Sequence, residues 1–105
     1  MHFCHPAIIK LADYDRVHNT TFLDTLRVYL YTNQNIAKAS DQLFIHRNTL
    51  GNRLLKISDL IHVDLCDSES VFHLMFSFHI LEYVGANITY DYQSRIKINP
   101  HLKHQ

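Results

Sequence analysis

The residues best suited to chemistry lie in one stretch of this 105-residue chain, LFIHRNTLGNRLLKI at positions 43–57. Arginine, lysine and asparagine side chains alternate there with leucines and isoleucines. At 100° per residue, Leu50, Leu54 and Ile57 fall in a narrow apolar stripe, with Asn48 and Asn52 opposite. Asparagine can bond adenine through two hydrogen bonds, and arginine or lysine can bond guanine or phosphate. The pattern predicts a helix that is anchored by its apolar stripe and offers its polar face to duplex DNA.

Seven side chains are candidate DNA contacts, most of them along the start and polar face of this helix: Arg47, Asn48, Thr49, Asn52, Arg53, Lys56 and Lys38. Some have plainer interpretations. Arg53 winds close to the apolar stripe and could instead pair with an acid such as Asp41. Thr49 could only cap or pack, and Lys38 would at most touch phosphate. His46 is interpreted as a helix-start residue rather than a pH switch.

Catalytic motifs are absent from the sequence. It contains no GxSxG, HExxH, P-loop or GxGxxG pattern, and its two glycines cannot build a glycine-rich phosphate loop. Asp13 and Asp15 are neighbours only in sequence, and we expect them at a solvated helix end. The sequence therefore predicts that the chain is not an enzyme.

Nine histidines raise the question of a metal site. His2, Cys4 and His5 stand close together, and His101 and His104 could in principle complete a set of ligands. Their spacing matches no common zinc motif, which would pair two such clusters. We expect incidental histidines, no metal and no cofactor; a histidine-rich metal sensor is a remote alternative.

The overall charge of zero argues mildly against nucleic acid, but it hides an uneven distribution. Residues 35–57 carry a net charge of +3, and residues 58–84 carry −5. A basic segment beside an acidic one leaves a polyanion as a plausible partner. Two distant cysteines, Cys4 and Cys66, form no disulfide framework and suit a reducing cytosol, so we expect a cytoplasmic location. No apolar run approaches a membrane span and no secretory signal opens the chain, so no membrane partner is expected.

Two glycines and two prolines favour long helices over short strands. Pro6 suits the first turn of a helix. The next helix is expected to be capped by Asn19 or Thr20 and to bury one face. Asn35 is the expected cap of a short helix over about 35–43.

The last helix, VFHLMFSFHILEYV after the capping Asp67, is apolar almost all the way round, with a polar strip only at His73 and Ser77. Such a helix is buried on two sides, either centrally in one chain or partly in a dimer interface. Gly85 is expected to end it. From Ile88 to Ile98, apolar and polar residues alternate with a period of two, which predicts a strand that pairs with another copy or is disordered. We therefore place a domain at 1–86 and a tail at 87–105.

The helix of about 35–43, the turn at Phe44 and Ile45, and the helix from His46 have the proportions of a helix-turn-helix over about 35–57. Small residues, Ala39 and Ser40, stand where the two helices must approach. The longer segment TLRVYLYTNQNIAKASDQLFIHRNTLGNRLLKISDLIHVDL resembles the C-terminal helix-turn-helix domain of PucR-type transcriptional regulators, and more distantly Fis-type DNA-binding helices. The specific parts are TLRVYL, LFIHRNTL and RLLKI, and the resemblance covers about residues 5–84.

The resemblance implies an all-α DNA-binding domain of about five helices that binds operator DNA as a homodimer, with a sensory region outside this chain. It carries the reading role to Arg47, Asn48 and Thr49, then to Arg53 and Lys56. The chain departs from the family at Asn52, where the family commonly has tyrosine, at Gly51 inside the reading helix, and at Ser40 in place of alanine. The alternative function is a helical dimerisation module without DNA binding, which the acidic half, Gly51 and the apolar last helix would suit.

Overall fold

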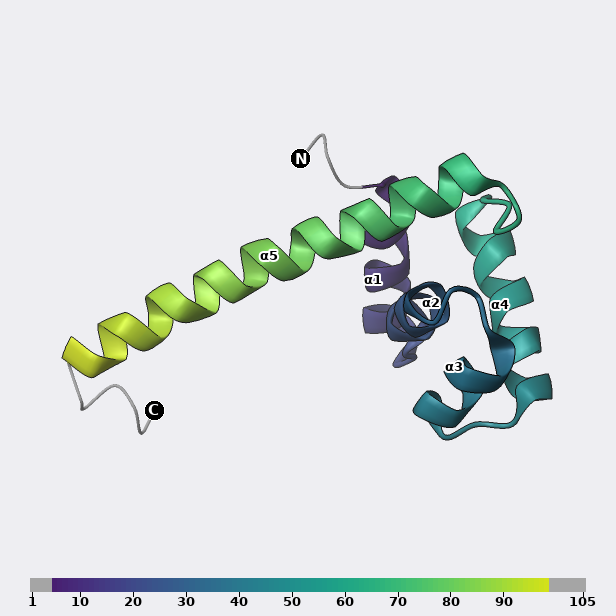
Figure 1. Cartoon of the computed structure of the whole chain (residues 1–105), viewed down its shortest axis with the longest axis horizontal. Coiled ribbons are helices and arrows are strands. Elements are labelled where there is room, and N and C mark those ends of the chain that lie inside the picture. The colour runs from purple at the N-terminus through teal and green to yellow at the C-terminus, as the bar shows by residue number, and fades with distance from the viewer. Residues whose placement is uncertain (1–4, 99–105) are drawn as a thin grey trace.

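Five α-helices make up the described part of the chain (Figure 1). The computed structural model describes residues 5–98, with side chains described through Gly85. The helices are α1 (Pro6–His18), α2 (Phe22–Tyr31), α3 (Ile36–Leu43), α4 (Arg47–Ile61) and α5 (Ser68–Ile98). Residues 5–98 contain no strand. The all-α class and the helix count predicted from the sequence are therefore confirmed.

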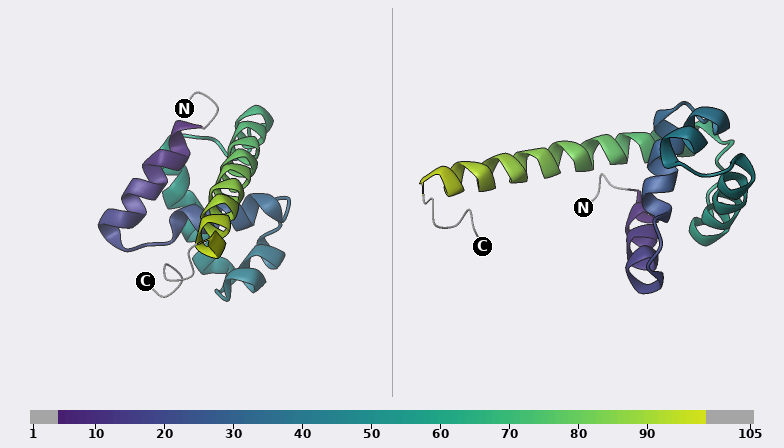
Figure 2. Two further views of the ribbon diagram at one scale, coloured as in Figure 1. Left: turned by 90° about the vertical axis from the view of Figure 1, so that its left-hand side faces the viewer. Right: turned by 90° about the horizontal axis from the view of Figure 1, so that it is seen from below.

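One hydrophobic core joins the helices. The apolar stripe predicted on α4 is buried, with Leu50 and Ile57 fully inaccessible to solvent. Together with Leu54 and Ile61 of the same stripe, these residues meet apolar side chains from the other helices in one cluster: Ala7, Ile8, Leu11, Phe22, Leu26, Val28, Leu30, Ala39, Leu74 and Phe78. Helix α2 packs against each of the other four helices, and α4 also packs against α1 and α3. Among the described helices, α5 packs only on α1 and α2. In Figure 2, α5 is seen nearly along its axis on the left and extends away from the other helices on the right.

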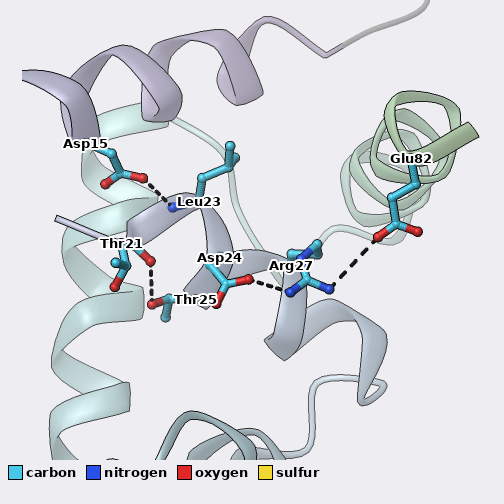
Figure 3. A network of polar contacts seen from close by, with 7 residues as sticks. All are labelled: Asp15, Thr21, Leu23, Asp24, Thr25, Arg27 and Glu82. Carbon is cyan, nitrogen blue, oxygen red and sulfur yellow. Dashed lines mark hydrogen bonds and ion pairs between the residues drawn. The ribbon is translucent and has the colours of Figure 1, made fainter. Parts of the chain in front are cut away.

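The cap of α2 differs from the prediction. Neither Asn19 nor Thr20 caps it. The carboxylate of Asp15, near the end of α1, accepts the backbone N–H of Phe22 at 2.8 Å and that of Leu23 at 2.9 Å; Figure 3 shows the bond to Leu23. The same carboxylate accepts the hydroxyl of Thr20. Asp15 therefore joins two helices and is not merely part of a solvated helix end, because the α1–α2 turn folds it back over the free N–H groups of α2.

Helix α5 is longer than the sequence pattern indicated. It begins after Asp67, whose carboxylate accepts the N–H and the hydroxyl of Ser70 as expected. It then continues through Gly85 to Ile98, so the predicted helix end at Gly85 and the predicted extended segment are wrong. The period of two was ambiguous, because Ile88, Tyr92 and Ile96 are also four residues apart, which fits a helix. The domain boundary at 86 stays a prediction.

Helix α5 is attached to α2 by aromatic and polar contacts. The ring of Tyr31 stacks on His79 at 4.9 Å between centroids, and Arg27 lies 3.9 Å from a carboxylate oxygen of Glu82 (Figure 3). Arg27 also pairs with Asp24 on its own helix. This attachment fixes the direction in which α5 projects from the other helices (Figure 1).

Only one side of α5 is buried in the monomer. Leu74, Ser77 and Phe78 face the core, and Ser77 donates its hydroxyl to the carbonyl of His73 at 2.8 Å. The expected polar strip is therefore split, because His73 is exposed and Ser77 is buried. Phe72 and Tyr83 remain about 70% exposed. Burial of both sides within one chain, one of the two alternatives, does not occur over residues 68–85.

Candidate nucleic-acid interface

Helices α3 and α4 form the predicted helix-turn-helix. The side chain of Asn35 caps α3 by accepting the N–H of Lys38 at 3.0 Å, as expected. Nδ1 of His46 caps α4 by accepting the N–H of Asn48 at 3.1 Å. His46 is thus a helix-start residue, and its bond fixes the direction in which the chain enters the first turn of α4.

The connection between the two helices is tight. Ala39 and Ser40 are buried where α3 meets α4, so small residues do allow the close approach that the sequence predicted. The N–H of Ile45 donates to the carbonyl of Ser40 at 3.1 Å, and Phe44 takes a left-handed conformation with φ of 57°. The connection is three residues long, from Phe44 to His46, and its backbone bond holds the start of α4 close to the end of α3.

The first two turns of α4 present a continuous polar surface. Arg47, Asn48 and Thr49 are exposed in the first turn, and Asn52 is exposed one turn later on the same side as Asn48. This surface lies opposite the buried stripe that begins at Leu50. In the described part of the chain the hydroxyl of Thr49 bonds no protein group, so its exposure does not support a capping or packing role.

Two of the predicted contacts lie on the flank of α4. Lys56 is exposed, and its ammonium lies 5.9 Å from the ring centroids of both Tyr14 and Phe22. Its side chain therefore leans toward α1 and α2, where a cation–π contact holds it weakly. Arg53 is half-buried. The structure places Arg53 and Lys56 beside the polar surface of α4 rather than on it.

The cations of the candidate site have no acidic partners. Over residues 5–85 the ion pairs involve Arg16 and Arg27 and none of the predicted contacts. The alternative pairing of Arg53 with Asp41 is therefore not formed in the described structure. Lys38 is exposed on α3. Together with the partial positive charge at the N-terminus of α4, these cations can approach phosphate without first breaking an ion pair.

Two features of this region were not predicted. Phe44 in the turn is 93% exposed, although the residues on either side of it pack against the core. Gly51 lines a groove of about 310 Å³ between α4, the start of α3 and the loop before α5, together with Leu55 and Cys66 among others. At 100° per residue Leu55 falls away from the apolar stripe, and this is a signal in the sequence for the groove, whereas no signal marks Phe44.

Other kinds of site find little support in the described residues. Over residues 5–85 no group of three or more histidine, cysteine, aspartate or glutamate side chains is arranged to hold a metal ion. The proposed ligands His2, Cys4, His101 and His104 lie outside the described residues. None of the described helices is long and apolar enough to cross a membrane.

Comparison with known proteins identifies this arrangement. Residues 22–80 match the model of the PucR C-terminal helix-turn-helix domain, which covers more than half of the chain. The chain is 39% identical over 61 residues to the proline-responsive transcriptional activator PutR of Bacillus subtilis (strain 168), covering 58% of this chain. It is 39% identical over 59 residues to the DNA-binding transcriptional activator AdeR of the same strain, covering 56% of this chain.

The matched segment is 14% of the length of each of these two relatives. No solved structure gives a significant match. The family model spans α2 through the first part of α5, so it includes the whole helix-turn-helix. The chain therefore belongs to the family of PucR C-terminal helix-turn-helix domains.

Proposed function

We propose that this chain is the sequence-specific DNA-binding part of a transcriptional regulator and that α4 enters the major groove by its N-terminal turns. The observation that carries the proposal is the exposed run of Arg47, Asn48 and Thr49, followed by Asn52, opposite a buried stripe. A major groove admits one helix, and base edges there accept and donate the hydrogen bonds that these side chains make.

The remaining cations supply phosphate contacts in this proposal. Lys38 on α3 and Lys56 on the flank of α4 are both exposed, and lysine contacts to phosphate position a protein on the duplex. Arg53 is half-buried and makes at most an edge contact. Support also comes from the relatives, one of which is named as a DNA-binding transcriptional activator.

Operator binding as a homodimer is the second part of the proposal, with the exposed face of α5 as the dimer interface. Phe72 and Phe76 stack at 6.4 Å between centroids while remaining 71% and 46% exposed, and Tyr83 is 70% exposed on the same helix. A contiguous exposed apolar surface of this kind marks an interaction site. Because α5 packs on α1 and α2 only, pairing through α5 leaves α4 of each copy free for DNA.

The same proposal includes where the protein acts and where its inducer is sensed. A DNA-binding regulator acts in the cytoplasm, and we place its inducer-sensing region outside the segment shared with PutR and AdeR. The supporting observation is that this segment is 14% of the length of each relative.

Selection of bound sequences from a random duplex pool tests the DNA-binding proposal. We expect an enriched half-site, repeated with two-fold symmetry if the protein binds as a dimer. Binding to mixed DNA should weaken steeply with salt, because phosphate contacts release counterions. An unenriched pool, together with binding that does not depend on salt, would reject the proposal.

The alternative is a helical dimerisation module that does not bind DNA, and the exposed aromatic face of α5 favours it. Sedimentation of Phe72→Asp separates the two parts of the proposal. The charged variant should be monomeric at concentrations where the original chain is dimeric, whereas Ile9→Asp on α1, similarly exposed, should remain a dimer. If the original chain dimerises but no DNA is selected, the alternative is the better account.

A further inference from the structure

The most exposed large apolar side chain among the described residues is Phe44, in the turn between α3 and α4. Its neighbours Leu43 and Ile45 are partly buried and pack against the core, but the Phe44 ring is 93% exposed and contributes nothing to the core. Removal of this apolar surface from water would be favourable, but no contact within the described structure buries it. A partner molecule could make use of it.

The backbone conformation of Phe44 is unusual for a phenylalanine. Its φ of 57° lies in the left-handed region, where glycine or asparagine is the common residue at the end of a helix. The end of α1 uses Asn19 in the same conformation. A phenylalanine here meets a steric penalty that glycine would avoid, and no packing within the described chain offsets it. Such an outlier supports an inference of function.

The position of the turn indicates the partner. Phe44 stands two residues before His46, the cap of α4, and three before Arg47, the first residue of the proposed reading surface. The turn lies on the side of the molecule away from α5, the proposed dimer helix (Figure 1). An occupant of the reading surface of α4 would therefore be within reach of the Phe44 ring.

We propose that Phe44 is a specificity-determining residue that places its ring against the C5-methyl group of a thymine at the edge of the half-site. This inference rests on the proposed DNA-binding function and adds to it an apolar contact that was not among the predicted polar ones. The thymine methyl is the apolar group that the major groove offers, and aromatic side chains are among its known partners. A phenyl ring has no donor for phosphate, so the contact adds no charge neutralisation.

The variant Phe44→Gly separates this role from folding. Glycine removes the ring and relieves the left-handed conformation, so the melting temperature should stay the same or rise. Affinity for the selected site should fall about tenfold, while the slope of log K against log salt stays unchanged because no phosphate contact is lost. Phe44→Asn, also compatible with this conformation, should behave in the same way. Ile9→Ala, an exposed apolar residue on α1, is the matched control and should bind normally.

Substitution of deoxyuridine for thymidine, one position at a time, identifies the contacted base. The original protein should lose about fourfold in affinity at one thymine of each half-site, the value expected for one buried methyl group. Phe44→Gly should no longer distinguish the two bases at that position. Such coupling between one methyl group and one side chain would support the inference.

Two results would overturn the inference without touching the proposed function. In the first, the original protein binds its selected site and Phe44→Gly binds it equally well. In the second, Phe44→Gly binds weakly but still senses the methyl group at every thymine, which would assign the ring to another part of the DNA or to a protein. Failure of the original protein to select any site would instead be a failure of the proposed function.

Discussion

Asp15 is the residue whose role depends most on the folded arrangement. Its carboxylate accepts two backbone N–H groups of α2 and the Thr20 hydroxyl, whereas Asp13 is exposed and pairs only with Arg16. We expect Asp15→Ala to lower the free energy of unfolding by about 2–3 kcal/mol, since it removes a charged cap. Asp13→Ala should cost less than about 0.5 kcal/mol, as exposed pairs do. Urea unfolding of both variants measures the difference, and equal losses would contradict the assigned role.

His5 gives the stability a dependence on pH. Its Nδ1 accepts the N–H of Ala7 at 3.0 Å, and its ring lies 4.7 Å from that of His73. Burial, and then the charge of His73, lower the pKa of His5 below its ordinary value of 6.5. The unfolded chain therefore binds the proton more readily than the folded one. Stability should be complete above about pH 6.5 and should fall as the pH drops through that value toward the folded pKa.

The variant His5→Asn checks this sign, because asparagine can cap α1 but does not titrate. Unfolding measured at pH 7.5 and pH 5.5 should show a smaller loss of stability in the variant than in the original chain. The two proteins differ only at residue 5, so the difference between them reports the contribution of His5. If the variant loses as much stability on acidification as the original, His5 is not the group responsible.

Residue roles could be predicted where the partners are close in sequence. Asn35 and Asp67 cap helices that begin one residue later, so local pattern was enough to assign them. The bonds of Asp15 span seven and eight residues across a turn, and their existence depends on how α1 and α2 pack. The exposure of Phe44 also depends on tertiary packing, because the burial of a turn residue is determined by how the helices assemble.

Gly51 is the residue of lowest helix propensity within α4. Its conformation is one that any residue adopts, and a β-carbon added there meets nothing within 4 Å. We expect Gly51→Ala to raise the free energy of unfolding by about 1 kcal/mol, the difference in helix propensity. Thermal unfolding measures this gain. A lower melting temperature would show that the protein groove beside Gly51 does not tolerate an added methyl group.

A second variant at this position tests whether Gly51 allows a close approach to DNA. Gly51→Leu should weaken DNA binding while leaving the fold intact, because a large side chain beside Asn48 and Asn52 would hold the helix away from the groove. If Gly51→Leu leaves the DNA affinity unchanged, Gly51 does not lie close to bound DNA, and its role is to line the protein groove.

Helical periodicity predicted α4 well and α5 only in part. The stripe of α4 is narrow because most of its other face is polar, so a single orientation buries Leu50, Leu54, Ile57 and Ile61 and leaves Leu55 exposed. Helix α5 is apolar on most sides, and its sequence could not indicate which side meets α2. Beyond Gly85 the pattern fits both a helix and a strand, and continuation of the preceding helix through Ile98 is what the structure shows.

The core of the molecule is separate from the projecting part of α5. Every buried apolar residue of the described structure lies between Ala7 and Phe78. A chain that ends at Gly85 should therefore unfold cooperatively, with a midpoint close to that of the full chain. Loss of a cooperative transition on this truncation would show that the fold depends on the segment after Gly85.

The placement of the elements keeps the two proposed contact surfaces apart. The helix-turn-helix lies on one side of the group of helices, and α5 extends away on another (Figure 1). Phe72, Phe76 and Tyr83, the exposed aromatic residues, are on α5. The sequence predicted both surfaces as separate patterns. It could not predict their relative placement, which depends on the attachment of α5 to α2 through Tyr31 and Glu82.

The most direct test of the reading role of α4 compares Asn48→Ala with Lys38→Ala on the selected site and on random duplex DNA. Lys38 is the better phosphate probe than Lys56, whose ammonium also lies over the rings of Tyr14 and Phe22. Asn48→Ala should cost about 1–3 kcal/mol on the selected site and little on random DNA. Lys38→Ala should weaken both about equally and reduce the salt slope by about 1. Unchanged binding in both folded variants would contradict the account, because α4 would then not be the element that reads DNA.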